Sequence, residues 1–236
     1  MGYAEIVRFL ILRTIGNFLV LFALYGIIAT FGPALYYEVS FRVIQARGVH
    51  YSVPVTTTKL GEILDRDKGV VHSGAPSFGS ILTGPTEQVL IPPDTEFSIV
   101  IPKIGASAKV FPNIDATEEK EFLPVLFKGV AHAKGTVLPG VSGNIYMFAH
   151  STDNFWDVGR YNAIFYLLKD LTPGDEVIVY FQNVRHNYVV SSSKIVEASD
   201  TSAIMQSHGG AETLILQTCW PPGTVWKRLL VYARPR

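Results

Sequence analysis

The chain has 236 residues, and its 20 basic and 20 acidic side chains give a formal net charge of zero. Nucleic-acid-binding proteins usually carry a basic excess or a basic stripe, so we exclude a nucleic-acid partner. The length allows one complete domain and an appendage. Cys219 is the only cysteine, which excludes an intrachain disulfide and makes this thiol a candidate for chemistry.

Residues 14–37 form an apolar segment without a charged side chain. About 20 apolar residues cross a hydrocarbon core of about 30 Å, whereas the apolar region of a secretory signal peptide has only about 7–15. Arg8 and Arg13 precede the segment and place the N-terminus in the cytoplasm by the positive-inside rule, although two arginines also follow it. We predict a cytoplasmic N-terminus and single-pass anchor over residues 1–37; a signal peptide or a buried core helix are the alternatives.

Residues 38–95 have the composition of an extracytoplasmic stalk or linker. Gly, Pro, Ser and Thr are scattered through this segment, and its short apolar runs follow no sustained period. Lys59 to Lys68 are compatible with a short helix. We expect the segment either to be disordered or to fold back over the domain that follows.

Regular short strands begin at about residue 97 and continue to the end of the chain. Thr117 can cap a short helix over 118–127, and a second helix is predicted over 161–171, before Pro173-Gly174. The predicted strands are 97–105, 108–112, 144–150, 175–181, 185–192, 194–198, 213–219 and 229–233, with a loop at 132–143 and a short helix from Asp200 or Thr201 through Gln206. This pattern indicates a mainly β domain over residues 96–236, a closed or nearly closed barrel of about eight strands with short helices.

Three candidate catalytic residues lie at strand ends. His150 ends one apolar strand, Cys219 ends another, and Arg228 opens the last. Strand ends at one rim of a barrel converge, and a nearby imidazolium or guanidinium favours the reactive thiolate. The alternative for each residue taken alone is structural: a buried cysteine, a surface or satisfied histidine and a solvated arginine.

Neighbouring basic residues compete with Arg228 for this role. Side chains alternate along a strand, so Lys227 should point the other way, and Arg234 lies at the far end. We predict neither a metal site nor a cofactor, because the sequence has no H-E-x-x-H or C-x-x-C pair and no glycine-rich phosphate loop.

Several segments together resemble the sortase family. TLILQTC at 213–219 resembles the sortase T-L-x-T-C signature with one extra residue, and NIYMFAHST at 144–152 resembles the strand that carries the family histidine. KRLLVYA at 227–233 is similar to the strand opened by the family arginine, which falls on Arg228. GTVLPG at 135–140 is similar to the turn upstream of the histidine strand. The resemblance extends over about residues 97 to 234.

The resemblance implies a membrane-anchored cysteine transpeptidase with a sortase-like barrel outside the cytoplasm. Cys219 would attack the Thr–Gly bond of a Leu-Pro-X-Thr-Gly-like sorting signal near the C-terminus of a surface protein. An amine of a cell-wall precursor or of a pilin lysine would then resolve the thioester. His150 would serve as general acid and then base, Arg228 would stabilise the oxyanion, and Thr218 would help to orient the substrate or its neighbours.

Two loops are expected to bind the sorting signal. The family shapes recognition with the loop at about 197–211, and we expect WPPGTVW, which opens with Trp220, to form one wall of the substrate groove. Some pilus-building sortases also have a lid with an Asp-Pro-aromatic motif. Asp94 follows two prolines rather than preceding one, so we do not expect a lid of that type.

Two other functions fit the same residues. A membrane-anchored assembly protein could bind a peptide without catalysis, and Cys219 would then be buried and unreactive. A hydrolase could use the same three residues with water as the acceptor.

Overall fold

The computed structural model describes residues 2–53, 78–83, 87–151, 164–206 and 208–236. It divides into two compact units, Met1–Arg42 and Val43–Arg236. The predicted helix at Lys59 to Lys68 lies outside the described residues.

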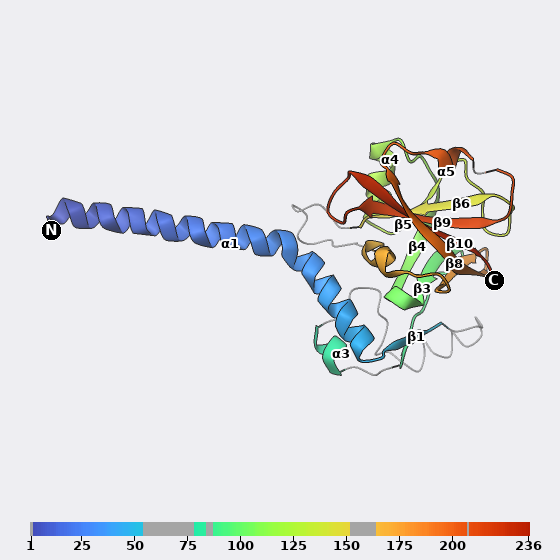
Figure 1. Ribbon diagram of the computed structural model, residues 1–236, viewed down its shortest axis with the longest axis horizontal. Coiled ribbons are helices and arrows are strands. Elements are labelled where there is room, and N and C mark those ends of the chain that lie inside the picture. The colour runs from blue at the N-terminus through green and yellow to red at the C-terminus, as the bar shows by residue number, and fades with distance from the viewer. Residues whose placement is uncertain (1, 54–77, 84–86, 152–163, 207) are drawn as a thin grey trace. The chain divides into compact units, whose positions relative to one another are not determined.

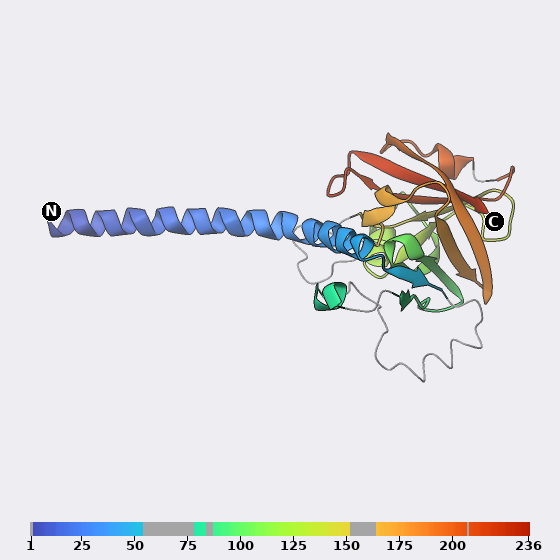
Figure 2. The same ribbon diagram turned by 60° about the horizontal axis from the view of Figure 1, so that its bottom comes forward.

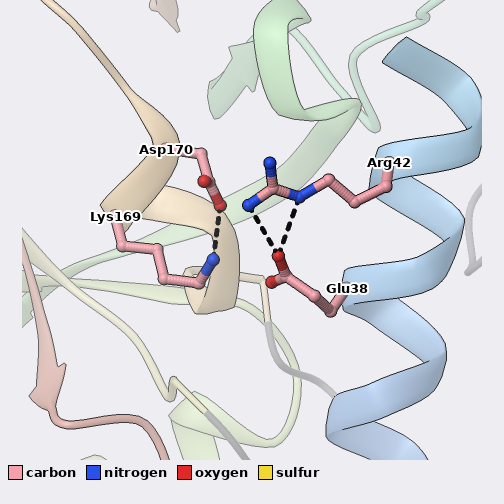
Figure 3. Close-up of polar contacts among 4 residues, drawn as sticks. All are labelled: Glu38, Arg42, Lys169 and Asp170. Carbon is pink, nitrogen blue, oxygen red and sulfur yellow. Dashed lines mark hydrogen bonds and ion pairs between the residues drawn. The ribbon is translucent and has the colours of Figure 1, made fainter. Parts of the chain in front are cut away.

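The N-terminal unit is helical. Helix α1, Tyr3–Ala46, is long, and its residues Tyr3–Ala29 have a mean hydropathy of 1.9 (Figure 1). By length and composition this stretch could cross a membrane, or it could be a signal sequence. It overlaps the predicted anchor at 14–37 but begins closer to the N-terminus. Within the same unit, Glu38 pairs with Arg42 one turn later, at 3.0 Å (Figure 3).

The C-terminal unit contains a closed eight-stranded barrel, which confirms the predicted fold class (Figure 1). The strand order is β10-β8-β7-β3-β4-β5-β6-β9. Most neighbours are antiparallel, but β4 pairs with β5 and β6 with β9 in parallel. The strands are β3 Phe97–Ile101, β4 Ala106–Ile114, β5 Val130–Ala133, β6 Asn144–Phe148, β7 Glu176–Phe181, β8 Val184–Glu197, β9 Thr213–Trp220 and β10 Lys227–Pro235.

Alternation along each strand separates an inner core from outer faces. All eight strands contribute to the inner core, for example through Ile99, Met147 and Leu216, each at most 1% exposed. A second apolar cluster lies on the outer face of β6, β9 and β10, where Tyr146 and Ile215 pack. Helices α4, Glu119–Leu126, and α5, Ser202–Met205, contribute residues to this second cluster.

The short helices agree with the predictions only in part. Helix α4 matches the helix predicted over 118–127, and Asp200 accepts a hydrogen bond from the Ser202 backbone at the start of α5. The helix predicted over 161–171 is only a short 3-10 helix, η2, at Tyr166–Asp170, and residues 161–163 lie outside the described part. Within η2, Lys169 pairs with Asp170 at 2.7 Å (Figure 3). A further 3-10 helix, η1, covers Pro102–Ile104.

Two described parts of the 38–95 segment fold back onto the barrel. Strands β1, His50–Ser52, and β2, Glu87–Val89, pair in parallel (Figure 2). Next to β2, Leu90 is buried against Val100 of β3 and Ile178 of β7. This contact covers the outer face of β3 and β7, which is one of the two expectations for this segment. Helix α3 covers Phe78–Thr83.

Asp94 lies at the start of the first barrel strand. Its carboxylate accepts hydrogen bonds from the backbone amides of Glu96 and Phe97, at 3.1 and 3.0 Å, and pairs with Lys109 at 3.0 Å. Asp94 therefore fixes the entry of the chain into the barrel.

Candidate active site

Strand β9 places Cys219 on the outer face of the barrel. Leu214 and Leu216 face the inner core, whereas Ile215 belongs to the outer cluster with residues of α4 and α5. Cys219 is four residues beyond Ile215, so strand alternation puts it on the same outer face. The thiol is only partly buried, because it lies near the end of the strand, beyond the close-packed part of that cluster.

The parallel pairing of β6 with β9 brings His150 beside Cys219. Phe148 is the partner of Gln217 in the register, and the Ala149 amide donates to the Gln217 carbonyl at 3.2 Å. Continuing this register by two residues places His150 next to Cys219. Phe148 is in the outer cluster, so alternation continued for two residues puts the His150 side chain on the same outer face.

Strand β10 adds Arg228 at the same level. Arg228 and Cys219 are direct partners in the antiparallel register, so their Cα atoms are about 5 Å apart. Leu230 belongs to the outer cluster, and Arg228 shares its face by alternation. Lys227 has the opposite parity and forms an ion pair with Glu197 of β8 at 3.1 Å. Strands β9 and β10 therefore carry Cys219 and Arg228 as direct partners, and His150 lies two residues beyond the end of β6, the other neighbour of β9.

The charge environment of Cys219 is set by two opposing effects. Burial raises the pKa of the Cys219 thiol, and the positive charge of Arg228 lowers it, but burial is the larger effect. The thiol is therefore protonated at neutral pH, and a proton acceptor or a substrate-induced change is needed to form the thiolate.

Backbone and aromatic contacts hold the other two residues. One terminal nitrogen of the Arg228 guanidinium donates to the carbonyls of Val225 and Lys227, at 3.0 and 3.1 Å. These bonds direct the guanidinium along the loop between β9 and β10. The ring of Phe127, just after α4, lies 5.7 Å from the His150 ring in a tilted arrangement. Sequence reasoning missed Phe127, because nothing in the local pattern links α4 to β6.

Thr218 and Trp220 lie on the other side of β9. Thr218 is 2% exposed, and its hydroxyl donates to the Ala149 carbonyl at 3.1 Å. This bond joins β9 to the residue before His150, so Thr218 is placed to orient its neighbours. Trp220 is half-buried and packs against the inner core, whereas Trp226 at the other end of the loop is 72% exposed.

A second histidine, His132, has structural contacts. His132 is buried, and its ring nitrogens contact the Val137 carbonyl and the Thr136 hydroxyl at 3.0 Å and the Asn113 amide at 3.4 Å. Burial lowers the pKa of His132, so this ring is neutral at pH 7.

Among the described residues, no group of three or more His, Cys, Asp and Glu side chains could hold a metal ion.

The C-terminal part of the chain is similar to known proteins. The Sortase domain family matches residues 99–236, which is more than half of the chain. Sortase D of Bacillus subtilis (strain 168) is 31% identical over 137 residues, covering 57% of this chain and 60% of that protein.

Two solved sortase structures also align with part of the chain. Sortase C-1 from Actinomyces oris aligns with a TM-score of 0.50 and 26% identity, over 61% of this chain and 76% of that one. Sortase C1 of GBS Pilus Island 1 aligns with a TM-score of 0.49 and 23% identity, over 59% of this chain and 63% of that one. Two of these three relatives are thus matched over about 60% of their own length. The family match, which begins in β3 and contains the whole candidate site, shows that this chain belongs to the sortase family.

Proposed function

We propose that the protein is a cysteine transpeptidase that cleaves a Leu-Pro-X-Thr-Gly-like sorting signal and transfers the acyl part to an amine. The observation that supports the proposal is the strand register: Arg228 of β10 is the partner of Cys219 on β9, and the β6–β9 register, continued two residues beyond the end of β6, leads to His150 at the same level. Membership of the sortase family supports the same chemistry.

The first half-reaction forms a thioester. The Cys219 thiol gives its proton to His150, which becomes the imidazolium, and the resulting thiolate attacks the threonine carbonyl carbon while the carbonyl electrons move onto the oxygen. The Arg228 guanidinium, next to Cys219 in the register, donates hydrogen bonds to this oxyanion. When the oxyanion collapses, the carbon–nitrogen bond breaks, and the His150 imidazolium gives its proton to the departing glycine amine.

The second half-reaction reverses these roles. An incoming primary amine attacks the thioester carbonyl, and His150, now neutral, accepts a proton from that amine. The carbon–sulfur bond then breaks, Cys219 leaves as thiolate, and a new amide bond joins the substrate protein to the acceptor. The acceptor class that we propose is an amine of a cell-wall precursor or of a pilin lysine.

The location that we propose follows from α1. Its apolar N-terminal stretch would anchor the protein in the cell membrane as a single span, with the barrel outside the cytoplasm. Residues 1–37 would then be the cytoplasmic N-terminus and anchor, 38–95 the connecting segment and 96–236 the catalytic domain. The substrates would be surface proteins with C-terminal sorting signals, which would meet the enzyme at the membrane surface.

The direct experiment uses the full chain in detergent with a fluorescent Leu-Pro-X-Thr-Gly peptide. We expect cleavage between Thr and Gly, and added triglycine or lysine peptides should divert the product from acid to amide. Cys219→Ala should abolish both products. Cleavage by this variant at the wild-type rate would overturn the proposal.

A binding protein without catalysis is the competing function, and one observation favours it: burial raises the pKa of Cys219. The two functions differ in thiol reactivity. Peptide binding without cleavage, together with resistance of native Cys219 to iodoacetamide, would favour the binding protein. Cleavage that added amines never redirect would instead indicate a hydrolase.

A further inference from the structure

A hydrogen-bonded polar pair lies within the apolar outer cluster beside the candidate catalytic residues. The Tyr146 hydroxyl of β6 donates to Oε1 of Gln217 on β9 at 2.6 Å. Gln217 precedes Cys219 by two residues, so the two side chains share the outer face and lie about 7 Å apart along the strand. The sequence shows Gln217 inside the TLILQTC segment, but not the tyrosine that binds it.

The Tyr146 bond fixes how the Gln217 amide is presented. Tyr146 is 2% exposed, and burial raises its pKa, so its phenol is neutral and able to donate. With Oε1 accepting from this phenol, the amide nitrogen points away from it and offers two N–H donors. Gln217 is half-buried, and within the described residues its side-chain amide makes this one hydrogen bond.

The packing of β9 limits what can meet these donors. Ile215, the next outward residue, is 1% exposed within the outer cluster, and Phe148, the partner of Gln217 on β6, is 5% exposed. Along β9, the accessible part of the outer face therefore ends at Gln217. An extended peptide joined to the Cys219 sulfur and running back along β9 reaches Gln217 after one or two residues, because each residue extends about 3.3 Å.

We propose that Gln217 is a substrate-binding residue, whose amide N–H groups bind a carbonyl oxygen of the acyl peptide one or two residues before the attacked carbonyl. Tyr146 is the positioning residue that holds the amide in this orientation. The inference rests on the proposed transpeptidase function and deepens it. The peptide must therefore present a hydrogen-bond acceptor opposite Gln217, whose neighbours on the outer face are apolar.

The test compares Gln217→Leu with wild-type protein in acylation by Leu-Pro-X-Thr-Gly peptides. Gln217→Leu removes the donors and leaves an apolar side chain that is one atom shorter, so kcat/KM should fall about 3- to 10-fold, the worth of one neutral hydrogen bond. Peptides with a thioamide at each position in turn, and peptides with exchanged side chains, identify the acceptor. One substitution should lower kcat/KM for wild-type protein and leave Gln217→Leu unaffected.

Two further variants separate recognition from structure. Tyr146→Phe keeps the buried ring but frees the amide, so it should weaken the preference at that same peptide position. Thr213→Val, on the same strand and face but at its far end, is the matched control and should behave as wild type. The rate of iodoacetamide reaction at Cys219 should be unchanged in all three variants.

The outcomes are distinct. Equal sensitivity of wild-type protein and Gln217→Leu to every peptide change would overturn the role of Gln217. A loss of kcat/KM in Gln217→Leu that is uniform across peptides and matched by slower iodoacetamide reaction would assign a structural role and also overturn it. If wild-type protein acylates none of the peptides while Cys219 still reacts with iodoacetamide, the proposed function itself fails.

Discussion

Two outer faces of the barrel are packed against other parts of the chain: that of β3 and β7, and that of β6, β9 and β10. They differ in how completely their residues are buried. On the first face, Leu90 seals Val100 and Ile178, which are both fully buried. On the second, the apolar cluster gives way to Gln217 and Cys219, which are half-buried. Side chains alternate in the same way on all of these strands. The outer face of β3 and β7 is nevertheless fully covered, whereas the outer face of β6, β9 and β10 is partly open and polar near Cys219.

This difference shows why the candidate site lies where it does. A buried thiol sealed like Ile178 could not meet a peptide, whereas a fully exposed one would lack the packing that holds its neighbours. Cys219 lies at the boundary, where β9 is still paired with β10 but its pairing with β6 has ended at Gln217. The predictions below test whether function belongs to the second face and stability to the first.

Removing the imidazole should have the largest effect on the second face. His150→Ala should lower kcat/KM for amine transfer by about 10²- to 10⁴-fold, because general acid–base catalysis contributes about that much. The measurement is peptide cleavage at saturating acceptor, with thermal unfolding to verify the fold. A variant with near wild-type turnover would remove His150 from the mechanism.

The charge on β10 should matter nearly as much. Arg228→Ala should lower kcat/KM about 10²- to 10³-fold, as expected for the loss of one oxyanion donor. Lys227→Ala is the matched control, since Lys227 pairs with Glu197 at 3.1 Å at the strand end and has the opposite parity. A severe loss of kcat/KM in Lys227→Ala, with only a mild loss in Arg228→Ala, would mean that Lys227 and not Arg228 stabilises the oxyanion.

Substitutions on the outer face of β3 and β7, which Leu90 covers, should lower the stability of the protein and leave its activity unchanged. Leu90 is 4% exposed, and Leu90→Ala should lower the free energy of unfolding by about 2–4 kcal/mol. The neighbouring Val89 is 39% exposed, so Val89→Ala should change it by less than about 0.5 kcal/mol. Denaturant unfolding measures both. A loss of activity in folded Leu90→Ala larger than that of His150→Ala would contradict the division between the two faces.

The smallest expected effect is a shift in the titration of Cys219. Burial raises its pKa, so the rate of iodoacetamide alkylation should reach half its maximum at a pH above the ordinary thiol value of about 8.5. Arg228 lowers that pKa, so Arg228→Ala should move the midpoint to still higher pH. A midpoint below that of a free thiol, or a move to lower pH in the variant, would contradict the two assigned effects.

Much of the barrel could be predicted from sequence, because apolar runs bounded by glycine and proline mark strands well. One strand was missed, and one open alternative was resolved. Residues 132–143 were predicted as a loop, but His132 and Ala133 belong to β5, where burial keeps the His132 ring neutral. Residues 194–198 were expected to extend or follow the strand at 185–192; they extend it, because β8 is continuous, with a register shift opposite it at Tyr232 and Ala233.

For the site, sequence reasoning could name residues at strand ends but not the pairs that only tertiary structure creates. His150, Cys219 and Arg228 stood out because each ends or opens an apolar run. The parallel register that sets His150 beside Cys219 joins strands about 70 residues apart, and no local pattern specifies it. The contacts of Phe127 with His150 and of Tyr146 with Gln217 were invisible for the same reason.

The most direct test of the central claim is the intact mass of the protein after brief mixing with a Leu-Pro-X-Thr-Gly peptide in the absence of an amine. The account predicts a mass increase equal to the acyl part ending in threonine, mapped to Cys219, reversed by hydroxylamine and absent in Cys219→Ala. His150→Ala and Arg228→Ala should accumulate it far more slowly. Peptide cleavage by the wild-type protein that proceeds without any acyl group on Cys219, and persists in Cys219→Ala, would contradict the account.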